Sequence, residues 1–83
     1  MKLLYFGWVR TRIGKQREDL SPPPEVKDVR GLIDWLSAKD PGYAAAFGEQ
    51  GVVKVAVNQE LADLDTPVAA NDEVALFPPM TGG

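Results

Sequence analysis

One apolar stripe in the first half of the chain most constrains the fold. Four apolar residues recur at the spacing of a single helix face: Val29, Leu32, Ile33 and Leu36. Asp28 stands where a helix N-cap belongs, and Asp40-Pro41-Gly42 ends the helix. Trp35 lies next to the stripe and is assigned to the core or its edge. Because such a helix must bury its apolar face, we expect it to pack on a sheet.

The segment before this helix predicts an N-terminal β-hairpin. Lys2 to Val9 is rich in residues that strands prefer, with Gly7 as a bulge or a point of close approach. Arg10 to Lys15 is expected to turn the chain into a return strand over Gln16 to Leu20. The prolines that follow Ser21 then break the sheet.

The segment after the helix predicts one further helical piece and three strands. Tyr43 to Phe47 has the composition of one or two helical turns. Three stretches have strand composition: 52–57, 60–62 and 73–77. Asn58 is expected in a left-handed turn between the first two of these strands. In the last strand, alternation places Val74 and Leu76 toward the core and Phe77 outward.

This order of elements predicts the fold class. A hairpin, a crossing helix and further strands give an α+β fold with a mixed sheet of four to five strands packed on one main helix. The order is compatible with a ubiquitin-like β-grasp. We assign residues 1–77 to the β-grasp domain and residues 78–83 to a flexible, extended C-terminal Gly-Gly tail.

Composition excludes several classes of function. The 83 residues suffice for one domain, and the absence of Cys and His excludes disulfide scaffolds, Cys/His zinc sites and Cys or His nucleophiles. Asp63 and Asp65 lack the Gly and Glu of a calcium loop, so they are assigned to turns and no metal site is predicted.

Charge and hydropathy also limit the partners. The net charge is −3, and the basic cluster of Arg10, Arg12, Lys15 and Arg17 is balanced by neighbouring acidic residues, so we expect no nucleic-acid partner. No apolar run is long enough to span a membrane, and the N-terminus lacks the pattern of a signal peptide. We therefore expect cytoplasmic residence.

The last six residues predict a chemical role. Pro78 and Pro79 should end the final strand and stiffen the chain beyond it. Gly82 and Gly83 make the end narrow enough for a channel without room for side chains. Such a tail suits insertion into the active site of another protein. The alternative is a frayed terminus, which is ordinary behaviour for chain ends.

Three stretches together resemble a known family. They are the run 72–83, which ends in Phe-Pro-Pro-Met-Thr-Gly-Gly, the opening Leu4-Tyr5-Phe6 with Val9-Arg10, and Val55-Ala56-Val57-Asn58-Gln59. Over nearly the whole chain and in this order, they resemble the small, sulfur-carrying subunits of molybdopterin synthase, within the ubiquitin-like sulfur carriers. Met80 departs from the smaller apolar residue expected there, which bears on the fit of the tail but not on the reacting group.

The resemblance implies a carrier rather than a catalyst. Gly83 would be adenylated with ATP by a separate ubiquitin-activating-like enzyme and converted to a thiocarboxylate by an external persulfide. The tail would then enter the large catalytic subunit of molybdopterin synthase, where its sulfur passes to the pterin precursor. Two deliveries would build the dithiolene of molybdopterin. The family also implies a heterotetramer of two small and two large subunits, with no cofactor bound to the carrier.

The resemblance further implies a role for each tail residue and a docking surface. Pro78 and Pro79 would hold the tail away from the domain, Met80 and Thr81 would line the channel, and Gly82 would permit insertion. An apolar docking surface is assigned to three residues: Phe6, Leu61 and Phe77. For Phe6, a plain core position remains open as the alternative.

Three other functions remain open at this point. A sulfur carrier of thiamine biosynthesis would use the same chemistry on a similar fold, although such chains lack the Phe-Pro-Pro stretch. A ubiquitin-like modifier would instead join Gly83 to a lysine. A plain interaction domain would not use the tail at all.

Overall fold

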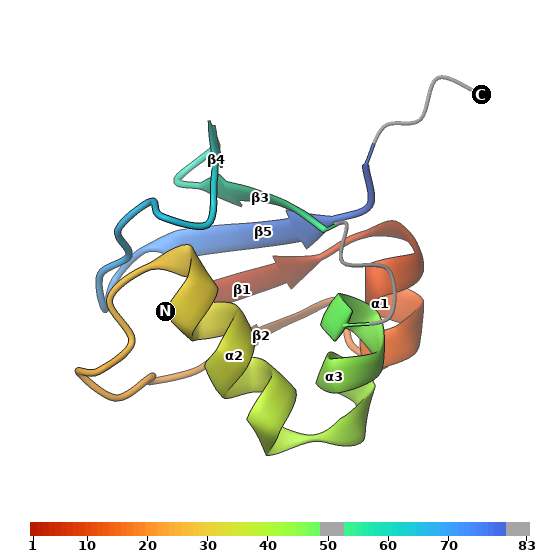
Figure 1. Cartoon of the computed structure of the whole chain (residues 1–83). Helices are drawn as coiled ribbons and strands as arrows, with labels where there is room; N and C mark the ends of the chain where they lie inside the picture. Colours follow the sequence, from red (N-terminus) through yellow and green to blue (C-terminus); the bar gives the residue numbers. More distant parts are fainter. Residues whose placement is uncertain (49–52, 80–83) are drawn as a thin grey trace.

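The structure, a computed structural model, describes residues 1–48 and 53–79. Helices and strands follow one another in this order: β1 (Lys2–Tyr5), α1 (Gly7–Ile13), β2 (Arg17–Asp19), α2 (Val29–Lys39), α3 (Pro41–Gly48), β3 (Lys54–Val57), β4 (Glu60–Ala62) and β5 (Glu73–Phe77). The strands form one sheet, with α2 and α3 on one face and α1 near the end of the sheet where β5 ends (Figure 1).

The sheet is mixed, and its centre is the pairing of the first strand with the last. The strand order is β2-β1-β5-β3-β4. β1 and β5 run parallel, whereas the other three pairs are antiparallel. A parallel pair needs a long crossover connection, and the chain between these two strands contains α2. The predicted α+β, β-grasp arrangement of strands around one main helix is confirmed.

The core lies between the sheet and α2. The predicted stripe is confirmed, since Val29, Leu32 and Leu36 are fully buried and Ile33 packs against the core. Trp35 packs at the core edge, as predicted. Alternate residues of the strands complete the core: Leu3, Tyr5, Val55, Val57, Val74 and Leu76.

Local hydrogen bonds begin and end the elements where the sequence predicted. The Asp28 carboxylate accepts from the backbone N–H of Gly31 at 2.8 Å, which confirms the N-cap of α2. Asn58 turns the chain between β3 and β4 with a φ of 52°, as predicted, and Gln59 follows with a φ of 70°. Two successive left-handed residues match the twist of the flanking strands in a tight hairpin.

The predicted N-terminal hairpin is wrong in its middle, where a helix replaces the turn. β1 ends at Tyr5, and Gly7, with a φ of 59°, redirects the chain into α1. Val9 is then fully buried and Ile13 packs against the core, at the i, i+4 spacing of one helix face. Gly14 ends the helix with a φ of 87°, and its N–H donates to the Arg10 carbonyl at 2.8 Å. The apolar residues after Gly7 therefore pack as a helix rather than extend β1.

A carboxylate on β2 joins three parts of the fold. The Tyr5 hydroxyl donates to Oε2 of Glu18 at 2.7 Å, and the Tyr43 hydroxyl of α3 donates to the same oxygen. The Lys15 ammonium donates to Oε1 at 3.0 Å. Burial by itself would raise the pKa of Glu18, but the hydrogen bonds from Tyr43, Tyr5 and Lys15 outweigh it and lower that pKa. The charged Glu18 carboxylate thus connects α3 to the sheet through its hydrogen bond from Tyr43.

Replacing the helix cap should weaken the fold measurably. Asp28→Ala is expected to lower the free energy of unfolding by about 1 kcal/mol, because the N–H of Gly31 loses its acceptor. Urea denaturation followed by circular dichroism measures the change. Asp34→Ala removes the same charge from an exposed position of α2 and serves as the control. Equal losses in both variants would mean that charge, not capping, stabilises the helix.

Loss of the Glu18 carboxylate should show a pH dependence of defined sign. At pH 7, Glu18→Gln is expected to lower the free energy of unfolding by about 1–2 kcal/mol, since charged hydrogen bonds are lost. The folded-state pKa of Glu18 is lowered, so its contribution is present above the unfolded pKa and disappears as the pH falls through the folded pKa. Urea titrations from neutral to acidic pH should show the two proteins converging. The exposed Glu25→Gln variant should track the wild type throughout.

Candidate functional site

The face of the sheet opposite α2, here called the outer face, carries an unbroken apolar row. Strand register places Leu4 beside Ala75, Ala75 beside Ala56, and Ala56 beside Leu61. This apolar row crosses β1, β5, β3 and β4. Leu61 is 79% exposed. A sheet face in contact with water normally carries polar side chains, so this composition indicates a surface for a partner.

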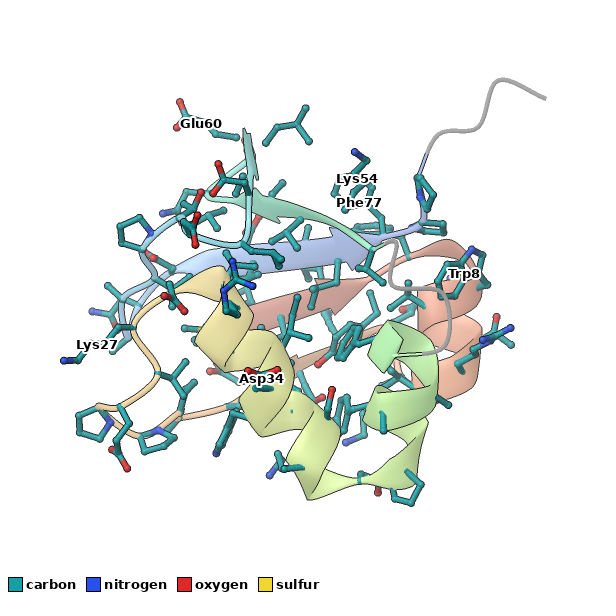
Figure 2. The ribbon with its side chains drawn as sticks, viewed as in Figure 1. Trp8, Lys27, Asp34, Lys54, Glu60 and Phe77 are labelled. Carbon is teal, nitrogen blue, oxygen red and sulfur yellow. The ribbon has the colours of Figure 1, made fainter. Side chains whose placement is uncertain are left out.

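Two of the three predicted docking residues lie together at the end where the tail begins. Phe6 continues the extended backbone of β1, its N–H donates to the Leu76 carbonyl at 3.1 Å, and its side chain is 50% exposed. Phe6 is therefore not a plain core residue. Phe77 faces outward beside Lys54, as Figure 2 shows, but is partly covered. Leu61 lies farther off, on the edge strand β4.

The β2 side of the outer face is basic. Arg17 lies opposite Leu4 in the β1–β2 register. Arg17 and Arg10 border a shallow hollow of about 270 Å³, whose apolar lining includes Leu4 and Phe6. The four residues of the basic cluster are exposed, and Lys15 forms an ion pair with Glu18, one of the neighbouring acidic residues. Two basic residues, Arg10 and Arg17, thus border the outer face on its β2 side, where Asp19 also lies, opposite Lys2.

The root of the tail is described, and its reacting end is not. Pro78 and Pro79 follow β5 and are partly buried. Met80, Thr81, Gly82 and Gly83, which the sequence assigns to the channel and the reaction, lie outside the described residues. The structure therefore locates the point from which the tail starts, beside Phe6 and Phe77.

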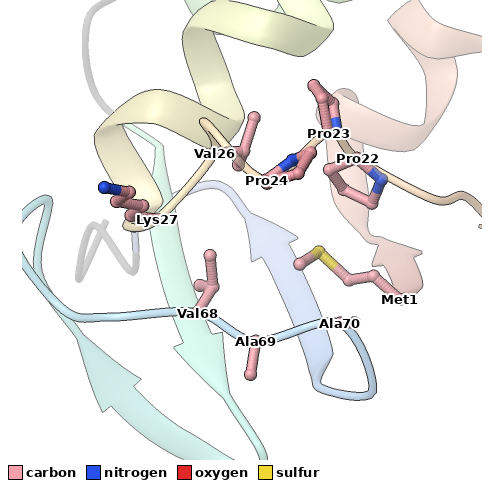
Figure 3. Close-up of a pocket in the computed structure, with 9 residues that line it drawn as sticks. All are labelled: Met1, Pro22, Pro23, Pro24, Val26, Lys27, Val68, Ala69 and Ala70. Carbon is pink, nitrogen blue, oxygen red and sulfur yellow. The ribbon is translucent and has the colours of Figure 1, made fainter.

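A second hollow lies at the far end of the sheet, away from the tail. It has a volume of about 250 Å³ and is lined by nine residues: Met1, Pro22, Pro23, Pro24, Val26, Lys27, Val68, Ala69 and Ala70 (Figure 3). The N-terminal amine of Met1 donates to the Leu20 carbonyl at 2.8 Å beside it. These residues, apolar except for Lys27, lie where the start of the first strand meets the neighbouring loops. The hollow therefore has few polar groups that could bind a ligand.

The described part of the chain also bears on metals and membranes. Within residues 1–48 and 53–79, no group of three or more His, Cys, Asp or Glu side chains could hold a metal ion. Among the helices of these same residues, none has both the length and the apolar character needed to cross a membrane.

The fold and the sequence define a class: a small β-grasp protein whose last strand lies in the middle of the sheet and whose chain ends in Gly-Gly. Residues 3–83 match the ThiS family, and the chain belongs to this family of sulfur carriers.

Curated relatives match over their full length. The chain is 36% identical over 83 residues to the molybdopterin synthase sulfur carrier subunit of Escherichia coli, covering 100% of this chain and 99% of that one. It is 36% identical over 88 residues to the subunit of the same name from Mycobacterium tuberculosis, covering 100% and 96%.

Solved structures share the fold. SAMP1 from Haloferax volcanii matches with a TM-score of 0.77 and 30% identity, covering 100% of this chain and 98% of that one. A Helicobacter pylori protein, solved as a complex of subunits 1 and 2 of molybdopterin-converting factor, matches with a TM-score of 0.63 and 26% identity, covering 99% and 96%.

Sequence reasoning missed the centre of the outer face. It named Leu61 and Phe77 but not Leu4, Ala56 or Ala75, which join them into one surface. The strand sequences carried a signal for this surface, because their apolar residues fall on both faces of the strands instead of alternating with polar residues. It also did not predict that Arg17 and Arg10 border this surface.

Proposed function

We propose that this chain is the sulfur carrier subunit of molybdopterin synthase. The observation that carries the proposal is the 36% identity to the Escherichia coli subunit across all 83 residues, which includes the terminal Gly82-Gly83. The apolar outer face beside the tail root supports it. The chain acts as a non-catalytic small subunit, and the catalytic groups belong to its partners.

The chemistry begins with activation of the Gly83 carboxylate, which is a poor electrophile. A carboxylate oxygen attacks the α-phosphorus of ATP on a ubiquitin-activating-like enzyme, and pyrophosphate leaves. The terminal sulfur of a persulfide then displaces AMP and forms an acyl disulfide. A second thiol cleaves the S–S bond, which releases the thiocarboxylate and leaves a disulfide behind. All thiols come from partners, because the chain has no Cys.

Delivery uses two parts of the chain with separate tasks. Residues 1–77 dock through the outer face, with Phe6, Leu61 and Phe77 among the contacts. Residues 78–83 extend into the large subunit, where the sulfur passes to the pterin precursor. Gly82 permits insertion, Met80 and Thr81 line the channel, and water restores the Gly83 carboxylate. Two deliveries complete a dithiolene, which suits an assembly of two small and two large subunits.

One observation favours a second function. The match to SAMP1, a small archaeal modifier protein, covers this whole chain at 30% identity. A modifier would use the same adenylated Gly83 but transfer it to a lysine amine instead of accepting sulfur. The thiamine pathway is a third use of the same thiocarboxylate. The acceptor of the activated carboxyl group, a lysine amine or sulfur, separates the modifier from the two sulfur carriers, and the molecule that receives the sulfur separates the two carriers from each other.

Blocking the terminal carboxylate should abolish function and leave the fold intact. An alanine added after Gly83 is expected to abolish pyrophosphate release with the activating enzyme and ATP, because the reactive carboxylate is displaced by one residue. Mass spectrometry should detect replacement of one oxygen by sulfur at the terminus of the wild-type chain only. The exposed Glu25→Gln variant should react like the wild type.

The product of this reaction decides between the candidate functions. Thiocarboxylate that converts the pterin precursor in the presence of the large subunit supports the proposal. Conjugates to lysine without thiocarboxylate would identify a modifier, and sulfur delivery to a thiazole precursor alone would identify the thiamine carrier. If the alanine-extended chain formed molybdopterin at the undiminished rate, the proposal that the Gly83 carboxylate is activated and carries the sulfur would be wrong.

A charge placed in the apolar row should weaken docking. Leu61→Asp is expected to raise the Kd for the large subunit at least about tenfold, because an interfacial leucine is replaced by a desolvated carboxylate. Isothermal titration calorimetry measures the Kd, and thermal unfolding should barely change because Leu61 is 79% exposed. Leu64→Asp is the matched control, since Leu64 lies by α2 in a hollow lined by Ile33. Equal weakening by both variants would remove the outer face from the interface.

A further inference from the structure

The first residue of the tail rests on the first residue of α1. A Cβ atom placed on Gly7 would lie 2.6 Å from Cγ and 2.9 Å from Cδ of Pro78, which is closer than nonbonded carbon atoms approach. The proline ring therefore occupies the space that any other residue at position 7 would fill. We call this packing the Gly7–Pro78 contact.

Three constraints meet at this contact. The Phe6 N–H donates to the Leu76 carbonyl at 3.1 Å and extends the pairing of β1 with β5 up to the start of the tail. Gly7 then turns the chain away with a φ of 59°, so its bare Cα faces the departing strand. Pro78 has a φ fixed by its ring. Phe6 is held by its hydrogen bond to Leu76, and the backbone of Pro78 is restricted by the proline ring. The direction in which the chain leaves the sheet is therefore set by how the Pro78 ring packs on Gly7.

We propose that Gly7 is a positioning residue for sulfur transfer, because it supports Pro78 and thereby sets the angle at which the tail enters the partner. This inference rests on the proposed function, in which Gly83 must reach a reacting atom inside another protein. The outer face and the tail root belong to one sheet, so a change in the direction of the chain at Pro78 would shift Gly83 relative to the docked partner. Displacement of a reacting group by 1 Å costs about 10²-fold in rate.

Two features of the structure favour glycine at position 7: the contact with Pro78 and the positive φ. Gly14, which has only the second feature, separates their effects. The positive φ of Gly7 alone disfavours a side chain. Gly14, at the other end of the same helix, has a φ of 87°, and a Cβ there would meet nothing within 4 Å. Alanine at either position introduces comparable backbone strain, but only at position 7 does it also displace Pro78.

The experiment compares these variants as full-length thiocarboxylates with the large subunit from the same genome. Gly7→Ala is expected to lower kcat for conversion of the pterin precursor by about tenfold, because the tail is misdirected after docking. The KM for the carrier should stay close to the wild-type value, since the outer face is unchanged. Gly14→Ala should lose similar stability in urea and keep the wild-type kcat.

Truncation of the proline tests the contact itself. Pro78→Ala removes Cγ and Cδ, the two atoms that would meet a Cβ on residue 7 most closely, and leaves the Cβ, which lies 4.0 Å away. The double variant Gly7→Ala/Pro78→Ala should therefore have the same kcat as Pro78→Ala alone. If the two substitutions lowered kcat additively in the double variant, the contact would not be the cause of the lower kcat of Gly7→Ala.

A readout independent of function completes the test. A nuclear Overhauser effect between the Gly7 Hα protons and the Pro78 ring protons is expected in the free wild-type carrier, and its absence would overturn the proposal. Equal kcat values for Gly7→Ala and Gly14→Ala would do the same. A wild-type carrier that transfers no sulfur to the pterin precursor would overturn the proposed function and the positioning role with it. The Overhauser effect would then show whether the contact exists without that role.

Discussion

The parallel pairing of β1 with β5 is the interaction on which the rest of the structure depends. It brings the two ends of the chain together, in the register Leu3 to Val74 and Tyr5 to Leu76, and these four side chains are almost fully buried. Parallel strands require a crossover connection. The connection between β1 and β5 contains α2, whose apolar stripe packs on the sheet. The same pairing places Phe6 and Gly7 beside the root of the tail. Stability and the geometry of delivery therefore share one set of hydrogen bonds.

Alternation along the strands divides the sheet between two tasks. Inward residues such as Val74 and Leu76 supply the core, and their outward neighbours Ala75 and Phe77 belong to the surface that a partner would cover. Substitutions on the outer face are therefore expected to change docking with little effect on folding, and those on the inner face are expected to do the reverse. This separation lets related chains keep one fold while their partners differ, as the likeness to both a sulfur carrier and a modifier protein illustrates.

The parts of the fold that could be predicted are those in which local pattern and tertiary packing agree. The stripe and cap of α2 and the alternation of β5 were correct because each depends on residues close in sequence. The helix α1 was missed because Trp8 and Val9 have strand propensity, and a glycine within a strand is typical of a bulge or a point of close approach. Burial of Val9 and Ile13 against other elements decides in favour of the helix, and that is tertiary information. The role of the terminal glycines stays a prediction from the sequence, whereas the Gly7–Pro78 contact joins residues that only the β1–β5 pairing brings together.

A carrier of this kind must satisfy two opposed requirements. Its end must be slender and adaptable enough to enter more than one active site, yet a freely hinged tail would lose conformational entropy each time it is ordered there. The division of the C-terminal segment meets both, because the prolines restrict the backbone where the tail leaves the sheet and the glycines come only at its end. Under the proposal made above, packing of Pro78 on Gly7 limits the directions in which the chain can leave the sheet. On this proposal the folded domain contributes to delivery by fixing the direction of the chain at Pro78.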